Sequence, residues 1–382
     1  MTTATTLPEI VSTNNHSDSF HVSTGYGRQI NEAVSAEQAL KLGNLDFHVN
    51  KIPVEYTTEN GERKIADGQF VNVRSDNGAS LGVVGERYKL LQNREAFAFM
   101  DEIVGNGLAS YEAAGVVNGG KTVWMMAKLP GSYDFGASRG VDTVYPYVLL
   151  VNTFDGSRSV QIIPTTRRMN CNNMLHSITA NARRQNNIYS LRHTKTLADK
   201  IGLVKTFLGN ATDDIAATMA IADQMANRQL SVAETQHYLD LLFPSQFRET
   251  APAPAIEQQP ATSGGLFDQL MQQPAKIEST PVVVDGELPE GFAATKRIAD
   301  RNGRIQTTIR ENMANERNAV DGIRGTLWSA YNAVSEYADH QKTVRGATAA
   351  ERSENRAFNN FFGTANELKN EAFAVAETLI AS

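Results

Sequence analysis

Alternating apolar and polar positions in the first half of the chain predict an antiparallel sheet built from hairpins. Three pairs of alternating runs flank turn residues: 70–75 and 81–91 around Asn77-Gly78, 109–117 and 122–129 around Asn118-Gly119-Gly120, and 144–153 and 159–165 around Asp155-Gly156. Asn and Gly tolerate the positive φ that a tight hairpin turn requires. Strands joined by hairpins pair antiparallel, so a meandering sheet is expected.

Apolar residues at helical spacing predict a helix between the first two hairpins and further helices in the second half of the chain. Asn93 is a predicted N-cap for a helix that runs to the glycine at 105, and the chain is predicted helical from Asn170 to Phe243. Capping boxes begin further helices at Ser35 and at Ser231. The predicted fold class is α+β in the order β-β-α-β-β-β-β-α, with helices on one face of the sheet and a helical C-terminal region.

Composition divides the chain into four segments. Residues 1–34 are polar without a sustained period and predict a disordered arm, and residues 35–243 form the α+β core domain. Residues 244–292 hold seven of the 12 prolines and predict a flexible linker, which precedes the helical region 293–382. An apolar island within the linker would either dock on a partner protein or pack back on its own domain: Leu266, Phe267 and Leu270.

The C-terminal region carries an aromatic stripe that packing against the core domain explains best. Its members recur at helical spacing: Leu327, Trp328, Tyr331, Val334 and Tyr337. In the same region, Glu336, Asp339 and His340 have a spacing that metal ligands can use, but such carboxylates are usually solvated or salt-bridged. The chain also lacks a phosphate-binding glycine loop, a nucleophile elbow and paired His/Cys spacings, so no catalytic residue, metal or cofactor is expected.

Bulk composition predicts a soluble cytoplasmic protein. No apolar run approaches the roughly 20 residues that span a bilayer, and the N-terminus resembles no secretory signal, so no membrane association is expected. The single cysteine, Cys171, excludes an internal disulfide and fits a reducing compartment. A buried structural role for this thiol is favoured over a catalytic one.

Charge is unevenly distributed along the chain. The net charge is −6, yet residues 157–210 hold nine basic residues and one acid, Asp199, so this stretch carries +8 and the remainder −14. The nine basic residues are Arg158, Arg167, Arg168, Arg183, Arg184, Arg192, Lys195, Lys200 and Lys205. Such asymmetry is typical of a surface that binds a polyanion.

Basic and amide side chains cluster in the segment that begins at Arg167, where a predicted strand leads into a predicted helix. Arg167 and Arg168 precede Asn170, Asn172 and Asn173, and a first helical turn offers free backbone N–H groups to an anion. The alternative is that Asn170 only caps the helix while the arginines are solvated or pair with acids elsewhere. The amides and Tyr189 that separate the later cations favour tracking of a nucleic-acid backbone with occasional base stacking.

Several phrases resemble one known family: "LGVVGERYKLLQNREAFAFMDEIV", "VWMMAKLPG", "YPYVLLVNTFDGSRSVQIIPTTRRMNCNNML", "GTLWSAYNAVSEYADHQ" and "FFGTANELKNEAF". They are similar to the phage/plasmid-like protein family, domain of unknown function 932, over about residues 35–243 and 293–378. Where members often carry Cys-Gln-Asn, this chain has Cys171-Asn172-Asn173. The order of elements is also similar to the core of single-strand annealing recombinases, which form rings that hold DNA along a basic groove.

Three functional hypotheses follow from these patterns, the third and last-ranked being a metal-dependent nuclease that uses Glu336, Asp339 and His340. The first is a phage- or plasmid-type nucleic-acid-binding protein, with single-stranded DNA favoured, that forms a homo-oligomer and assists annealing or recombination. The second is a structural or host-interaction protein without enzymatic activity, which oligomerises through its basic stretch against the acidic remainder.

Overall fold

The structure is a computed structural model, and it describes residues 27–98, 100–105, 107–135, 142–158, 160–168, 189–191, 197–245 and 292–381. The chain divides into two compact units. One comprises residues 1–235 together with 309–382, and the other comprises residues 236–308. The C-terminal helices therefore belong to the same unit as the sheet.

The larger unit is organised around a main sheet in the order β1-β5-β6-β8-β9-β10, with β7 paired to β8, and every pairing is antiparallel. Its strands are β1 (Arg28–Gln29), β5 (Ser110–Val117), β6 (Thr122–Lys128), β7 (Tyr133–Asp134), β8 (Thr143–Thr153), β9 (Val160–Arg168) and β10 (Tyr189–Leu191). The α+β class and the hairpins β5–β6 and β8–β9 are confirmed. The turns use the expected residues, with positive φ at Asn118, Gly119 and Gly156.

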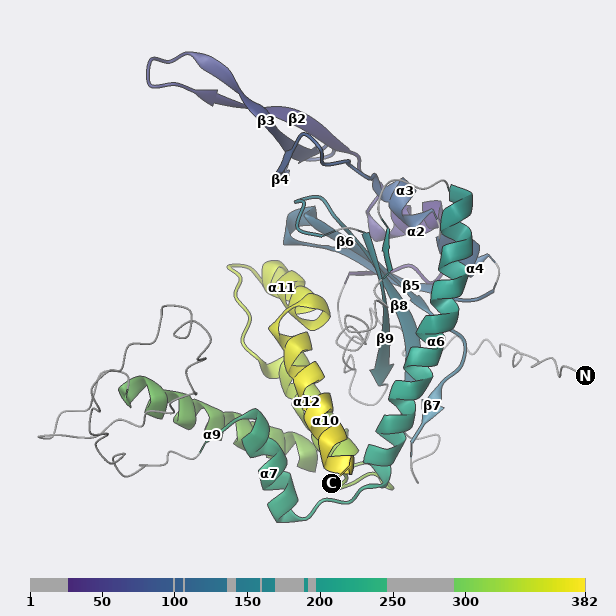
Figure 1. Cartoon of the computed structure of the whole chain (residues 1–382), viewed down its shortest axis with the longest axis vertical. Helices are drawn as coiled ribbons and strands as arrows, with labels where there is room; N and C mark the ends of the chain where they lie inside the picture. The colour runs from purple at the N-terminus through teal and green to yellow at the C-terminus, as the bar shows by residue number, and fades with distance from the viewer. Residues whose placement is uncertain are drawn as a thin grey trace, which may run out of the picture. The chain divides into compact units, whose positions relative to one another are not determined.

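A smaller sheet contains the first predicted hairpin. It has the order β2-β3-β4 and comprises β2 (Val49–Thr57), β3 (Arg63–Arg74) and β4 (Ser80–Gly85), with Gly78 at positive φ between the last two strands. The ribbon of β2 and β3 extends away from the main sheet in Figure 1. The smaller sheet is anchored to the residue that follows β8: the buried side chain of Asn72, on β3, donates a 2.6 Å hydrogen bond to the carbonyl of Phe154.

Short helices follow from local capping chemistry. The side chain of Ser35 caps α2 (Ala36–Gly43), as its capping box predicts. The helix predicted from Asn93 occurs as two short helices, α3 (Asn93–Phe97) and α4 (Met100–Val104). Its N-cap is Gln92 and not Asn93, because Asn93 is buried and donates a 2.9 Å hydrogen bond to the carbonyl of Leu45.

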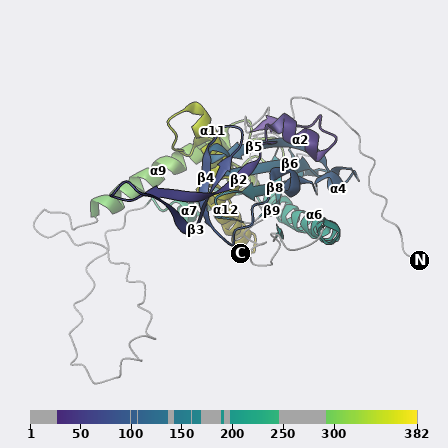
Figure 2. The same cartoon turned by 90° about the horizontal axis from the view of Figure 1, so that it is seen from above.

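Helices cover both faces of the main sheet, and not one face as the sequence predicted. On one face, Ala357 and Phe361 of α11 (Ala349–Phe362) pack against strand residues that include Trp124 and Leu149. On the other, α2 contacts β5 and α6 (Leu197–Asn227) contacts β9. Figure 1 shows α11 and α12 (Thr364–Ala381) on one side of the strands and α2 and α6 on the other, and Figure 2 shows α11 and α6 on opposite sides. Double coverage explains why β6 and β8 are buried at nearly every position.

The aromatic stripe packs into the larger unit, as expected. Trp328 of α10 (Leu327–Glu336) lies 4.8 Å from Phe135 between ring centroids, and Tyr331 lies 5.4 Å from Phe373 of α12. The chain then makes a π-helical turn, Tyr337–Gln341. These contacts explain the inclusion of residues 309–382 in the unit that holds the sheet.

Two segments differ from the sequence interpretation. Tyr189–Leu191, within the stretch predicted helical from Asn170, forms β10 and pairs with Val160–Ile162 of β9. The predicted arm contributes β1, and Ile30 is fully buried, so the folded region begins before residue 35. Residues 1–26 and the Pro-rich segment from 246 to 291 lie outside the described residues.

The smaller unit is organised around hydrogen bonds between two helices, α7 (Val232–Leu242) and the first part of α9 (Phe292–Ala314). Gln306 donates to Asp240 Oδ1 at 2.8 Å and to the carbonyl of Phe243 at 2.7 Å. Asn302 donates to the carbonyl of Pro244 at 2.9 Å. Buried side-chain amides therefore hold α9 in one rotational setting.

Candidate nucleic-acid interface

Arg168 ends β9 in a buried polar network. Its Nε donates to Asp142 Oδ1, and its Nη1 donates to Asn318 Oδ1 at 2.7 Å, while the arginine and aspartate side chains are both fully buried. Asp142 Oδ2 accepts a 2.9 Å hydrogen bond from the Trp328 indole N–H. Asn318 donates in turn to Glu336 Oε2 at 2.5 Å. The network links the end of β9 to α10.

Arg167 is also buried, with an exposed fraction of 1%. It interacts with the phenol of Tyr147 across the β8–β9 pair. Burial and the carboxylate of Glu112 raise the pKa of Tyr147, whereas Arg167 acts in the opposite direction through its charge and its hydrogen bond. Arg167 therefore interacts with a residue of the neighbouring strand, and its side chain is not exposed to solvent.

The burial of Arg167 and Arg168 argues against the direct phosphate contacts that the sequence assigned to them. A guanidinium without accessible surface cannot meet a phosphate unless the surrounding core opens. For Arg168 the observed arrangement matches the alternative interpretation, in which the arginine pairs with an acid elsewhere, here Asp142. This pairing satisfies the strong preference of a buried charge for a partner.

Arg158 lies at the opposite end of β9, beside α11. Its guanidinium carbon is 4.7 Å from the ring centroid of Phe362 and 5.7 Å from that of Phe358. Its side chain is half-buried, and its carbonyl accepts a 2.6 Å hydrogen bond from Thr153 Oγ1. Because the full length of β9 separates Arg158 from Arg168, the arginines of the basic stretch whose side chains are described do not form one continuous surface.

The remaining candidates fall where the structure gives no side chains. Lys200 and Lys205 lie on α6, whose first residues are described as backbone only. The others lie outside the described residues: Asn170, Asn172, Asn173, Arg183, Arg184, Arg192, Lys195 and Cys171, together with the apolar island of Leu266, Phe267 and Leu270.

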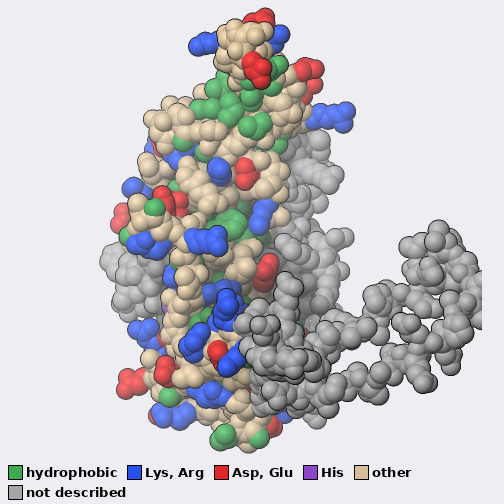
Figure 3. Space-filling view, turned by 90° about the vertical axis from the view of Figure 1, so that its left-hand side faces the viewer, with side chains coloured by type: hydrophobic (Ala, Val, Ile, Leu, Met, Phe, Trp, Pro, Cys, Tyr) green, Lys and Arg blue, Asp and Glu red, His purple; other side chains and the backbone are tan. Residues whose placement is uncertain are grey.

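A basic surface that the sequence interpretation missed lies on α9. Arg297, Arg301 and Arg304 are exposed and follow one another at intervals of four and three residues. On an α-helix that spacing places side chains along one face. Figure 3 shows several Lys and Arg side chains in the lower half of the side of the molecule that it presents. The spacing was available in the sequence, but the helix phase that exposes these residues was not.

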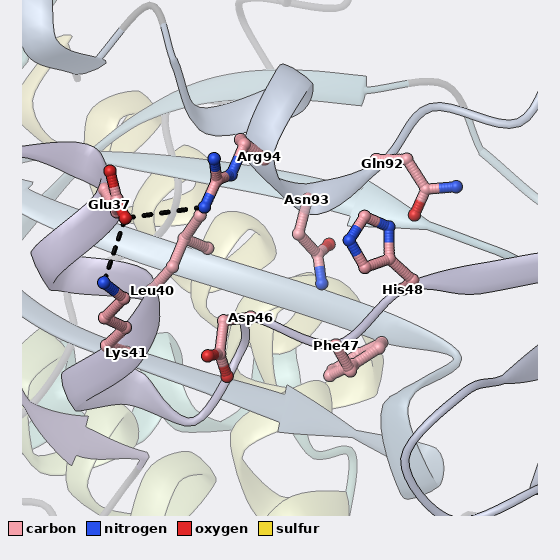
Figure 4. A pocket seen from close by; sticks show the side chains of 9 residues that line it. All are labelled: Glu37, Leu40, Lys41, Asp46, Phe47, His48, Gln92, Asn93 and Arg94. Atoms are coloured by element: carbon pink, nitrogen blue, oxygen red, sulfur yellow. Dashed lines mark hydrogen bonds and ion pairs between the residues drawn. The ribbon is translucent and has the colours of Figure 1, made fainter.

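A pocket lies between α2, α3 and the residues that lead into β2 (Figure 4). Its lining includes Glu37, Lys41, His48 and Arg94. Glu37 pairs with Lys41 at 2.9 Å and with Arg94 at 3.5 Å. The pKa of Glu37 is lowered chiefly by the hydrogen bond and charge of Lys41, and further by the charge of Arg94. These two cations already pair with a neighbouring carboxylate, so the pocket offers little to an anionic ligand.

The residues considered as metal ligands do not converge on one site. Glu336 accepts a hydrogen bond from Asn318, and Asp339 forms a buried 2.7 Å ion pair with Lys369 of α12. Both carboxylates are buried, whereas His340 is exposed, and the ion pair of Asp339 matches the salt-bridged interpretation. Among the described residues, no group of three or more His, Cys, Asp or Glu side chains is arranged to hold a metal ion.

The helices of the described chain include none that combines the length and apolar character needed to cross a membrane.

The fold defines a class: an α+β protein with a doubly covered antiparallel sheet and a C-terminal helical region packed into the same unit. A family model described as "Domain of unknown function (DUF932)" matches residues 80–359, and the chain belongs to this family. The family model matches a shorter range at both ends than the resemblance found in the sequence, which extends from about residue 35 to about residue 378. No curated protein and no solved structure matches the chain.

Proposed function

We propose that this protein binds nucleic acid, with single-stranded DNA as the favoured ligand. The observation that carries the proposal is the charge of residues 183–205, six basic side chains against one acidic side chain in a protein of net charge −6. Counterion release makes such a segment a strong and salt-sensitive ligand for a phosphate backbone. Phosphate contacts carry no sequence information, so binding is expected to be non-specific.

The proposal assigns different roles to the arginines of the basic stretch. Arg167 and Arg168 are internal supports, because both are buried and Arg168 is paired with Asp142. The proposed phosphate contacts are the later cations of the stretch, with the two lysines of α6 continuing the charge: Arg183, Arg184, Arg192, Lys195, Lys200 and Lys205. Asn170, Asn172 and Asn173 would supply amide donors to the same phosphates.

In this proposal the protein acts in the cytoplasm as a homo-oligomer and assists single-strand annealing or recombination on a phage or plasmid. The oligomer follows from the similarity of element order to annealing recombinases, and fold similarity alone does not determine function. The competing candidate is a structural protein that oligomerises through the same basic stretch. Its support is the charge of −14 on the remainder of the chain.

Fluorescence anisotropy of a labelled single-stranded oligonucleotide tests the proposal. The titrations compare the wild type with Arg183→Ala/Arg184→Ala at several salt concentrations, beside a duplex of equal length. We expect binding that weakens steeply with salt, and a slope of log affinity against log salt that falls by about 1.4 in the variant, at roughly 0.7 per phosphate of a single strand. Arg63→Ala/Lys64→Ala, an equal charge change at exposed positions of β3, is the matched control.

The oligomeric state separates the two candidate functions. Loss of DNA binding with an unchanged sedimentation coefficient supports the nucleic-acid proposal. Dissociation of an oligomer by Arg183→Ala/Arg184→Ala, with no binding of DNA by the wild type at low salt, would overturn it in favour of the structural candidate.

A further inference from the structure

We propose that the arginine face of α9, formed by Arg297, Arg301 and Arg304, is a second phosphate-binding surface for single-stranded DNA. This inference rests on the proposed function and extends it to another part of the molecule. The surface lies wholly within the smaller unit, whereas the basic stretch lies in the larger unit.

Helix geometry aligns the three side chains. At about 100° per residue, positions 297, 301 and 304 fall within about 60° of one another around the helix axis, and they span about 10 Å along it. That length is enough for guanidinium groups to meet successive phosphates of an extended strand. Each guanidinium offers several planar donors to phosphate oxygens, which makes arginine better suited than lysine to this contact.

The opposite face of the helix fixes this orientation. Asn302 and Gln306 are buried, with exposed fractions of 8% and 2%, and they bond to residues of and just after α7. These amides point about 140° to 180° away from Arg297 around the axis. Rotating the arginines out of solvent would break hydrogen bonds of buried amides, which is costly.

The arginines are available for a ligand. All three are exposed, and among the described residues none of them forms an ion pair. Residues 292–314 contain five basic and two acidic residues, a balance of +3 within a chain whose net charge is −6. A local excess of exposed positive charge attracts a polyanion.

Nucleic acid is the occupant favoured here because the proposed function already supplies single-stranded DNA as a ligand, and the geometry of α9 fits it. A row of three guanidinium groups on one helix face can meet a chain of phosphates, each with several acceptor oxygens. An acidic helix can present carboxylates at the same spacing, so competition by poly-glutamate separates the two occupants.

The test is the anisotropy titration with the full chain carrying Arg297→Ala/Arg301→Ala/Arg304→Ala. We expect the slope of log affinity against log salt to fall by about 2, from three phosphate contacts at roughly 0.7 each. The control is Arg87→Ala/Arg317→Ala/Arg324→Ala, which removes the same charge from exposed positions outside this helix face. Circular dichroism of both variants verifies that the fold is retained, which is expected because substitutions of exposed side chains change stability little.

The outcomes distinguish this inference from the proposed function. Wild-type binding with a reduced slope only in the α9 variant supports both. Wild-type binding with equal slopes for the α9 variant and its control overturns the second surface and leaves the proposed function standing. Absence of wild-type binding overturns both, and competition by poly-glutamate as effective as competition by oligonucleotide of equal charge would identify an acidic-peptide surface and overturn the inference.

Discussion

At the residue scale, burial decides what an arginine does. Arg168 and Arg297 carry the same charge, yet Arg168 is enclosed with Asp142, whereas Arg297 lies in solvent. Removing a guanidinium from water costs several kcal/mol, which a paired carboxylate and further hydrogen bonds offset. The network around Asp142 is therefore expected to matter for stability more than for ligand binding.

Asp142→Asn provides a test of this network. The substitution leaves the buried Arg168 charge without its carboxylate, so we expect the free energy of unfolding to fall by about 3–5 kcal/mol. Urea denaturation followed by circular dichroism measures the change. Glu37→Gln, which removes a carboxylate from an exposed ion pair of α2, is the control and should leave the midpoint nearly unchanged. Equal midpoints for the two variants would contradict the assigned role of Asp142.

At the scale of the element, α11 illustrates how an amphipathic helix completes a sheet. Phe361 is buried and meets Trp124 of β6 edge to face, with ring centroids 5.2 Å apart. Phe362, the next residue, is only partly buried and interacts with Arg158. Consecutive residues on a helix face different directions, so these two phenylalanines contribute unequally to the core.

The pair Phe361→Ala and Phe362→Ala measures this difference within one helix. Phe361→Ala opens a cavity against Trp124, so we expect a loss of about 3–5 kcal/mol in the free energy of unfolding. Phe362→Ala removes the same atoms from a partly exposed site and should cost clearly less. Thermal and urea unfolding report both values, and an equal loss would contradict the packing of α11 against the main sheet.

At the scale of the whole molecule, the sheet and the C-terminal helices form one unit although more than a hundred residues separate them in the chain. Trp328 donates to Asp142, and Phe361 packs on Trp124. A sheet that is apolar on both faces needs a cover on each face, and the C-terminal helices, with α11 in direct contact, supply one of them. The larger unit is therefore expected to require residues 309–381 in order to fold.

Truncation after residue 308 tests that dependence. The shortened chain exposes one face of the main sheet and leaves Arg168 without Asn318, so we expect loss of cooperative unfolding and aggregation. Circular dichroism melts and limited proteolysis, compared with the full chain, measure the loss. A protease-resistant fragment of residues 27–235 with a cooperative melt would show that the sheet folds without the C-terminal helices.

Local sequence features were sufficient to establish the class of the fold and most of its hairpins. Turn residues such as Asn118-Gly119 and Asp155-Gly156 act through backbone conformations that few other residues adopt, so their positions can be inferred without tertiary information. The same holds for the capping box of Ser231 and Glu234, whose reciprocal hydrogen bonds occur as predicted. Family membership could also be inferred, since it depends on sequence alone.

Which charged residues are available to a ligand depended instead on the tertiary fold. Arg167 and Arg168 are close to Arg158 in sequence, but their environments depend on Tyr147, Asp142 and α10, which come from other parts of the chain. The exposed face of α9 is likewise set by hydrogen bonds to residues more than fifty positions earlier. Charge is a property of composition, whereas solvent access follows from packing among distant segments, and for this reason the burial of Arg167 and Arg168 and the exposed arginine face of α9 could be established only from the fold.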